Sequence, residues 1–202
     1  VFTSDHGDML GDHRLIGKRF MYEPSARVPL IMRAPWLRRE GCRIPGNISH
    51  IDLVPTLLDL MGHALPEQLQ GQSRASVLRG EETVDGNDVV VQHNGAPVEV
   101  NWRPYDSPVR DGGVLGDEPT AEGDDEISRV NELPWRTVVT SDRWKLNLCA
   151  GDRSQLFDMN TDPHELNNLF DQPEHVDRIR AMAARIRQWQ QETGDRAPLS
   201  DV

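Results

Sequence analysis

A short apolar run that ends in an aspartate and a histidine opens this chain. Residues 1–3, Val-Phe-Thr, have the character of the last residues of a buried strand, and Asp5 and His6 follow one residue later. In open α/β sheets, ligands bind beyond the carboxyl ends of the strands. The sequence therefore predicts an α/β fold in which a strand delivers a carboxylate and an imidazole to the ligand-binding edge of a sheet.

Asp5 and His6 together offer half of a divalent-metal site. A carboxylate supplies hard, charged oxygen and an imidazole supplies neutral nitrogen. Neighbouring residues of a regular strand point to opposite faces, so both reach one ion only where the strand breaks into a loop, and Gly7 permits that break. The alternative is that Asp5 caps a helix and His6 is a solvated loop residue. By spacing alone this alternative is favoured, because protein metal sites need at least three protein ligands.

Five short motifs follow one another between residues 4 and 31. They are Ser4-Asp5-His6-Gly7-Asp8, Leu10-Gly11-Asp12-His13, Gly17-Lys18, Tyr22-Glu23 and Arg27-Val28-Pro29-Leu30-Ile31. Their order and intervals closely resemble those of the sulfatase family in the alkaline-phosphatase-like superfamily. The version in this chain is most similar to the branch that holds choline sulfatases and phosphonate monoester hydrolases.

The resemblance implies a role for three of these residues. Asp5 and His6 match two ligands of a single divalent cation, which is calcium, magnesium or manganese. Many sulfatases have an asparagine where His6 stands, so the sequence leaves the metal open. Lys18 matches the lysine that contacts the sulfate or phosphonate oxygens and stabilises the leaving oxygen.

The amino-acid composition supports a functional role for Lys18. It is one of only two lysines among the 22 basic residues counted as Lys and Arg. A compact ammonium suits a tetrahedral oxyanion as a point charge. The alternative of a solvated surface lysine stays open.

The nucleophile of a sulfatase is not found in this chain. In the family it is a formylglycine, made from the Cys or Ser of a C/S-x-P-x-R motif in the N-terminal part, which also carries two more acidic metal ligands. Cys42-Arg43-Ile44-Pro45 has its proline one place late, and Cys149-Ala150-Gly151-Asp152-Arg153 has glycine where the proline belongs. We therefore expect Val1 to be a gene, cloning or proteolytic boundary within a longer protein, and this chain alone to be inactive.

Three functions remain open at this stage. The resemblance implies the C-terminal portion of a metal-dependent sulfatase that hydrolyses sulfate esters. The first alternative is a phosphonate or phosphodiester hydrolase with the same site, since both reactions pass through a tetrahedral, anionic centre. The second is a non-catalytic fragment that binds a metal or a partner.

The formal charge excludes one class of partner. A net charge of −11 at pH 7 argues against nucleic acid, whose phosphates demand a basic face. A small anionic ester is not excluded, because a cation and one lysine can set the local field. The sequence contains no run of 18 apolar residues, so it predicts no membrane-spanning helix. A homo-oligomer is left open, and the compartment is unknown, with the cytoplasm weakly favoured.

The remaining pattern predicts two parts. Residues 1–85 are expected to complete the C-terminal side of a large sheet, with a buried strand over 28–33 and a helix over 52–62 whose N-terminus is capped by the side chain of Asp52. Residues 86–202 are expected to form a small antiparallel sheet, with strands at 89–91, 135–140, 144–148 and 155–159 and a helix over 173–192. Within this second part, between its first two strands, residues 103–132 have the low hydrophobicity and dense negative charge of a mobile loop.

The second region of resemblance covers the end of that small sheet. Leu156-Phe157-Asp158-Met159, Asp162-Pro163, Glu165 and Asn167-Asn168-Leu169 closely match the sulfatase C-terminal subdomain, with its pattern L-Y/F-D-x-x-x-D-P-x-E-x-x-N-L. The three acidic residues could form a metal site, but Asp162 beside a proline more simply begins a turn.

Overall fold

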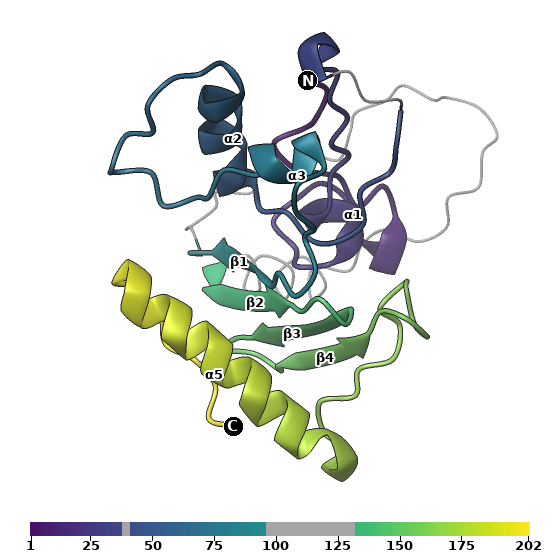
Figure 1. Ribbon diagram of the computed structural model, residues 1–202. Helices are drawn as coiled ribbons and strands as arrows, with labels where there is room; N and C mark the ends of the chain where they lie inside the picture. Colours follow the sequence, from purple (N-terminus) through teal and green to yellow (C-terminus); the bar gives the residue numbers. More distant parts are fainter. Residues whose placement is uncertain (38–40, 96–131) are drawn as a thin grey trace, which may run out of the picture.

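The computed structural model describes residues 1–37, 41–95 and 132–202 of the chain. Its C-terminal part is a four-stranded antiparallel sheet with one long helix, α5, against one face, and the N-terminal part lies against the other (Figure 1). The strands are β1 Val89–His93, β2 Trp135–Val139, β3 Trp144–Leu148 and β4 Gln155–Asp158, in the sheet order β1-β2-β3-β4. The predicted small antiparallel sheet is confirmed. The predicted acidic loop lies outside the described residues, except for Glu132.

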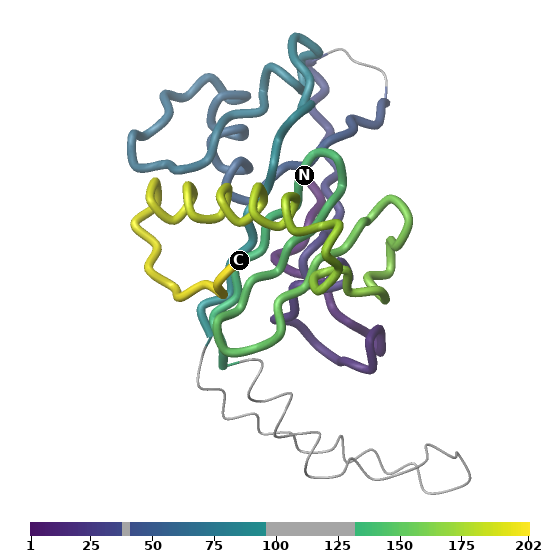
Figure 2. Tube along the Cα trace, turned by 90° about the horizontal axis from the view of Figure 1, so that it is seen from below, coloured from purple at the N-terminus to yellow at the C-terminus, as the bar shows by residue number. Residues whose placement is uncertain are grey.

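The helix predicted over 173–192 is also confirmed. It consists of a 3-10 turn, η4 Pro173–His175, followed by α5 Val176–Thr193. Gly194 ends the helix in the left-handed conformation, with φ 72°, which glycine adopts without a steric penalty. α5 crosses the strands of the sheet (Figure 2).

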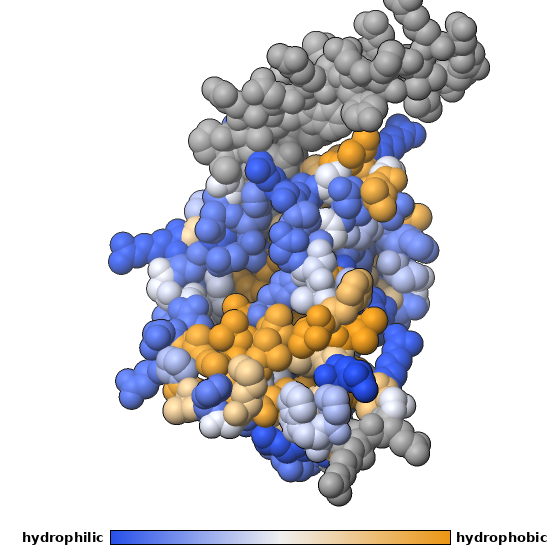
Figure 3. Space-filling view, turned by 90° about the horizontal axis from the view of Figure 1, so that it is seen from above, coloured by the Kyte–Doolittle hydropathy of each residue, from blue (hydrophilic) through white to orange (hydrophobic). Residues whose placement is uncertain are grey.

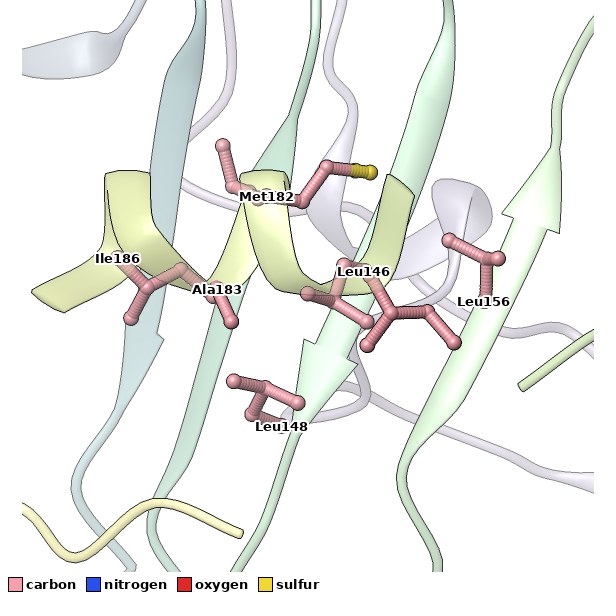
Figure 4. Close-up of a cluster of buried hydrophobic side chains, with 8 residues drawn as sticks. Leu146, Leu148, Leu156, Met182, Ala183 and Ile186 are labelled. Atoms are coloured by element: carbon pink, nitrogen blue, oxygen red, sulfur yellow. The ribbon is translucent and has the colours of Figure 1, made fainter. Parts of the chain in front are cut away.

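The main hydrophobic core lies between α5 and the sheet (Figure 4). The strands contribute Val138, Leu146, Leu148 and Leu156, and α5 contributes Ile179, Met182, Ala183 and Ile186. The four helix residues are spaced three or four apart, which places them on one face of a helix. Alternation along β3 sends Leu146 and Leu148 toward α5 and sends Lys145 and Asn147 to the other face of the sheet.

Truncation of this core is our first prediction. Ile186 is fully buried, so Ile186→Ala is expected to lower the free energy of unfolding by about 2–5 kcal/mol, through lost burial and the cavity that remains. The exposed neighbour Arg187 is the control, and Arg187→Ala is expected to change it by less than about 0.5 kcal/mol. Urea denaturation followed by circular dichroism measures both. Equal effects of the two substitutions would contradict this assignment of the core.

The second face of the sheet, opposite α5, carries buried polar side chains beside apolar ones such as Trp135. Lys145 and Asn147 on β3 and Thr137 on β2 are each 0% exposed. Thr137 Oγ1 donates to Asn147 Oδ1 at 2.8 Å, across a directly paired position of the two strands. This face packs against the N-terminal part of the chain, where Met21 lies in one hydrophobic cluster with Trp135 and Cys149, so polar and apolar side chains together join the two parts of the molecule.

The predicted helix near residue 52 is confirmed, but the predicted role of Asp52 is wrong. The helix is α2, Leu53–Leu60, which follows a 3-10 turn, η3 His50–Asp52. Asp52 makes no side-chain cap; its carboxylate accepts hydrogen bonds from the backbone N–H of Gln72 and from Nε of Arg74, both at 2.9 Å. The carboxylate therefore ties η3 to the segment that leads into α3, Ala75–Arg79.

The strands predicted at residues 1–3 and 28–33 are not buried in this chain, which corrects the prediction. They meet in a single antiparallel bridge between Phe2 and Ile31, whose exposed fractions are 64% and 63%. A single bridge has no neighbouring strands to cover its side chains. Exposed hydrophobic surface gathers on the face formed by the N-terminal part of the chain (Figure 3). Within the described residues, no helix is both long enough and apolar enough to cross a bilayer.

Three short elements complete the N-terminal part. They are the 3-10 turn η1 Asp12–Arg14, the helix α1 Glu23–Ala26 and the 3-10 turn η2 Pro35–Leu37. α1 lies between the opening loop, which carries Asp5 and His6, and the face of the sheet opposite α5. It contacts the loop through Ser25 and the sheet through Glu23.

Candidate functional site

The structure brings the three predicted site residues together. His6 Nε2 lies 3.4 Å from Asp5 Oδ2 and 2.7 Å from Lys18 Nζ. All three side chains line the same broad hollow in the N-terminal part. Asp5 is exposed and His6 is partly covered, with side-chain exposed fractions of 83% and 37%. A carboxylate, an imidazole and an ammonium therefore converge on one point that solvent can reach.

The tautomer of His6 follows from its backbone contact. Nδ1 lies 2.7 Å from the carbonyl oxygen of Gly7, which can only accept, so Nδ1 donates its proton there. In the neutral ring, Nε2 then carries the lone pair and accepts from the Lys18 ammonium. A backbone carbonyl that fixes the tautomer in this way is typical of metal-ligating histidines.

The local field keeps Asp5 ionised. Desolvation by itself would raise the pKa of its carboxyl. Hydrogen bonds from the backbone amides of Asp5 and His6, with the charges of His6 and Lys18, outweigh it and hold the pKa below its ordinary value. Ser4 Oγ also donates to Asp5 Oδ1 at 3.4 Å and to the His6 carbonyl at 2.8 Å.

A clamped loop carries Lys18 back to His6. Asp8 Oδ1 accepts from the backbone N–H of Leu10 at 2.9 Å and of Gly17 at 3.2 Å, and the Met9 N–H donates to the Gly17 carbonyl at 2.7 Å. Within the loop, His13 stacks on Tyr22 with ring centroids 3.9 Å apart. The loop is closed by its own polar groups, which holds its two ends together.

Backbone strain accompanies that closure. Four residues without the freedom of glycine have positive φ, namely Leu10, His13, Arg14 and Arg19. Such conformations each cost of order 1–3 kcal/mol and persist only where surrounding contacts impose them. The hydrogen bonds that the Asp8 carboxylate accepts from the backbone of Leu10 and Gly17 are contacts of that kind.

Gly7 brings the Asp5–His6 pair into close contact with α1. Its N–H donates to the Ser25 carbonyl at 2.9 Å. A Cβ at this position would lie 1.9 Å from the carbonyl oxygen of Pro24, which is a backbone atom with little freedom to move. Only glycine therefore allows the loop to approach α1 this closely.

Our second prediction concerns this approach. Gly7→Ala is expected to destabilise the protein by about 1–3 kcal/mol or more, because the methyl group forces backbone to shift, and to displace Asp5 and His6. Gly41→Ala is the control, since no atom lies within 4 Å of a Cβ there. Thermal unfolding of both variants measures the difference. If Gly7→Ala were as stable as the control, the loop that carries Asp5 and His6 would not depend on its close contact with α1.

The donor atoms fit a divalent cation, although they do not complete a site. Bonds of about 2.1–2.4 Å that meet at roughly a right angle place two ligand atoms about 3.0–3.4 Å apart, which matches Asp5 Oδ2 and His6 Nε2 at 3.4 Å. In the part of the chain that the structure describes, no three His, Cys, Asp or Glu side chains gather into a possible metal site. Asp5 and His6 are therefore a pair that needs ligands from elsewhere.

Asp162 begins a turn after β4, as predicted, and Asp158 at the end of β4 makes local hydrogen bonds of the same kind. The Asp158 carboxylate accepts from the Asn160 N–H and the Thr161 hydroxyl, both at 3.0 Å. Asp162 accepts from the backbone N–H groups of Leu166 at 3.1 Å and Asn167 at 2.8 Å. These carboxylates are occupied by local hydrogen bonds.

Sequence reasoning missed a buried ionic network next to this turn. The Lys145 ammonium lies 2.7 Å from Glu165 Oε1 and 3.1 Å from Glu23 Oε1. Burial raises the pKa of the Glu165 carboxyl, against the opposing effects of Lys145 and of the hydrogen bond from the Glu23 N–H. Two sequence signals pointed toward it: Lys18 and Lys145 are the two lysines in the chain, and Glu165 belongs to the second region of resemblance.

Comparisons with known proteins agree on one family. Residues 11–94 match the family model described as N-sulphoglucosamine sulphohydrolase, C-terminal. The chain is 34% identical over 173 residues to the uncharacterized sulfatase YidJ of Escherichia coli, covering 85% of this chain and 28% of that protein. It is 31% identical over 173 residues to the choline-sulfatase of Rhizobium meliloti, covering 86% and 27%.

Solved structures share the fold of this chain. One is a protein in complex with its substrate D-glucosamine-2-N,6-O-disulfate, with a TM-score of 0.74 and 26% identity over 97% of this chain and 34% of that one. Another is the phosphonate monoester hydrolase of Agrobacterium radiobacter, with a TM-score of 0.66 and 24% identity over 95% and 34%, a likeness of fold alone. The chain thus spans about a quarter to a third of the length of the proteins it matches.

Proposed function

Because this chain belongs to the sulfatases and corresponds to their C-terminal portion, we propose that it is the C-terminal part of a metal-dependent hydrolase of sulfate esters. The observation that carries the proposal is the convergence of Asp5 Oδ2, His6 Nε2 and Lys18 Nζ. The two ligand atoms have the spacing of neighbours around one ion, and the ammonium stands beside them.

Each of the three residues has a distinct task in this proposal. Asp5 and His6 hold a divalent cation, which is calcium, magnesium or manganese, and such a cation supplies Lewis acidity toward a sulfate oxygen. Lys18 binds the oxygens of the sulfate group and offsets the charge that develops on the leaving oxygen. The hydrogen bond from His6 Nδ1 to the Gly7 carbonyl keeps Nε2 aimed at the shared point.

The rest of the catalytic site is assigned to residues outside this chain. Neither cysteine stands in a formylglycine motif, and a pair of ligands needs at least one more. We place the formylglycine and the remaining acidic ligands in a segment that precedes Val1 in the full-length protein. On this proposal, residues 1–202 alone are inactive, and the substrate is a small anionic ester.

Hydrolysis assays on the full-length protein test this function. Produced in cells that form formylglycine, it is expected to hydrolyse an aryl sulfate, to lose that activity after chelation, and to recover it with calcium, magnesium or manganese. Residues 1–202 alone are the matched control and are expected to give no hydrolysis. Full-length protein that carries formylglycine and metal but hydrolyses no sulfate monoester would overturn the proposal.

A phosphonate or phosphodiester hydrolase is the second candidate. The fold is shared with a phosphonate monoester hydrolase, and both reactions pass through a tetrahedral, anionic centre that the same site could bind. Turnover of a sulfate monoester and of a phosphonate monoester with the same leaving group separates the two. A kcat/KM at least about tenfold higher for the phosphonate would favour the second candidate.

A further inference from the structure

A fully buried lysine lies beneath the candidate site but does not contact it. Lys145 is on β3, with 0% of its side chain exposed, and it faces away from α5. Its ammonium contacts one carboxylate that is also fully buried, Glu165, and one at 22% exposure, Glu23. Exchanging a buried ion pair for apolar side chains is often neutral or stabilising. Stability therefore does not explain this network well, and its place in the fold suggests another role.

The network fixes the first residue of α1 in two ways. Lys145 Nζ holds the Glu23 side chain at 3.1 Å, and Glu165 Oε2 accepts from the Glu23 backbone N–H at 2.6 Å. Glu165 itself has a left-handed backbone with φ 56°, and its N–H donates to the Asp162 carbonyl at 3.1 Å. Both carboxylates thus come from rigid local structure.

α1 connects the buried ionic network to the candidate site. The residues after Glu23 present two carbonyls to the opening loop: the Ser25 carbonyl accepts the Gly7 N–H, and the Pro24 carbonyl packs on the Gly7 Cα. The Gly7 carbonyl in turn lies 2.7 Å from His6 Nδ1. One continuous path of contacts therefore runs from Lys145 through Glu23 and α1 to His6.

We propose that Lys145 is a positioning residue, which seats α1 through Glu23 and Glu165 and thereby holds the Asp5–His6 loop in its ligand geometry. The contacts stand by themselves, while the purpose of the positioning rests on the proposed function. Without the ammonium, the carboxylates of Glu23 and Glu165 face each other without a cation, so α1 is expected to shift away from the sheet. The hydrogen bond from Gly7 to Ser25 then weakens.

Hydrogen exchange on the full-length protein tests this proposal without any assay of activity. Lys145→Met keeps the stem and removes the charge, and it is expected to speed amide exchange in a peptide covering residues 4–9 about tenfold. Thr137→Val is the matched control: it removes the buried hydrogen bond to Asn147 on the same face of the sheet and leaves the contacts of Lys145 with Glu23 and Glu165 in place. The control is expected to leave exchange in residues 4–9 unchanged.

Mn²⁺ titration gives the second readout. Lys145→Met is expected to weaken Mn²⁺ binding up to about tenfold, the lower end of the effect of losing a direct partner of a metal ligand, because Lys145 acts on His6 only through α1, while Thr137→Val leaves the affinity unchanged. If the wild-type protein bound no Mn²⁺, the proposed function would fail, but the exchange experiment would still judge the positioning role.

A second variant keeps the proposal testable if the first one does not fold. If Lys145→Met does not fold, Glu23→Gln keeps the backbone hydrogen bond to Glu165 and removes only the charge that faces Lys145. It is expected to speed exchange in residues 4–9 by a smaller factor, about threefold. Unchanged exchange in a folded variant of either residue, or equal acceleration by Thr137→Val, would overturn the proposal.

Discussion

Replacing Asp5 with alanine in the full-length protein is expected to lower kcat/KM for sulfate-ester hydrolysis about a thousandfold or more. A bound metal contributes several kcal/mol to the transition state, and each 1.36 kcal/mol is a factor of ten in rate. Alanine removes the charged oxygen that lies 3.4 Å from His6 Nε2, and with it most of the affinity for the ion. Initial rates at saturating metal, with metal content measured in parallel, give the result.

Asp12→Ala is the matched control for that experiment. Asp12 is an exposed carboxylate that lines the same hollow, so its removal changes the charge near the site by the same amount. It is expected to alter kcat/KM by less than about threefold, because an exposed charge that touches neither metal nor substrate acts only through a screened field. A fully active Asp5→Ala protein would refute the assignment of Asp5.

The second large effect is expected from Lys18→Ala. Loss of one group that stabilises developing charge typically costs about 10²–10³ in kcat. Unlike Asp5→Ala, this change removes no ligand of the proposed ion, so metal content is expected to stay at the wild-type level. The two variants therefore differ in kind: one loses the metal, and the other keeps it and loses rate.

The control for Lys18 is a basic residue of the same loop. Arg14 is exposed on η1, and Arg14→Ala is expected to retain most of the wild-type kcat. Steady-state kinetics together with metal analysis on the three proteins decide the matter. If Lys18→Ala raised KM and lowered kcat no more than Arg14→Ala does, the lysine would be a solvated surface residue, the alternative that the sequence left open.

Local patterns were sufficient for the C-terminal part of the fold. The hairpin of β2 and β3 and the helix α5 follow from alternation and from three-to-four spacing, which depend on neighbours in the sequence. The same logic misjudged Asp52, because its carboxylate binds Gln72 and Arg74, about 20 residues further on. Helix-start rules contain no information on such distant partners.

The candidate site divides in the same way. Asp5, His6 and Lys18 stand in a compact motif, so their convergence was predictable from the resemblance. Lys145 and Glu23 are separated by 122 positions, and a lysine within a strand pattern gives no sign that it is buried. The exposed bridge of Phe2 and Ile31 was missed for a related reason: periodicity reports which residues are apolar, and burial depends on what covers them.

The most direct test is a crystal structure of the full-length protein grown with Mn²⁺, with the ion located by its anomalous scattering. The account predicts one peak within about 2.0–2.6 Å of an Asp5 carboxylate oxygen and of His6 Nε2, with Lys18 Nζ facing the same cavity. An ordered loop without a peak at saturating Mn²⁺, or an ion bound elsewhere in the site while Asp5 and His6 point away from it, would contradict the account.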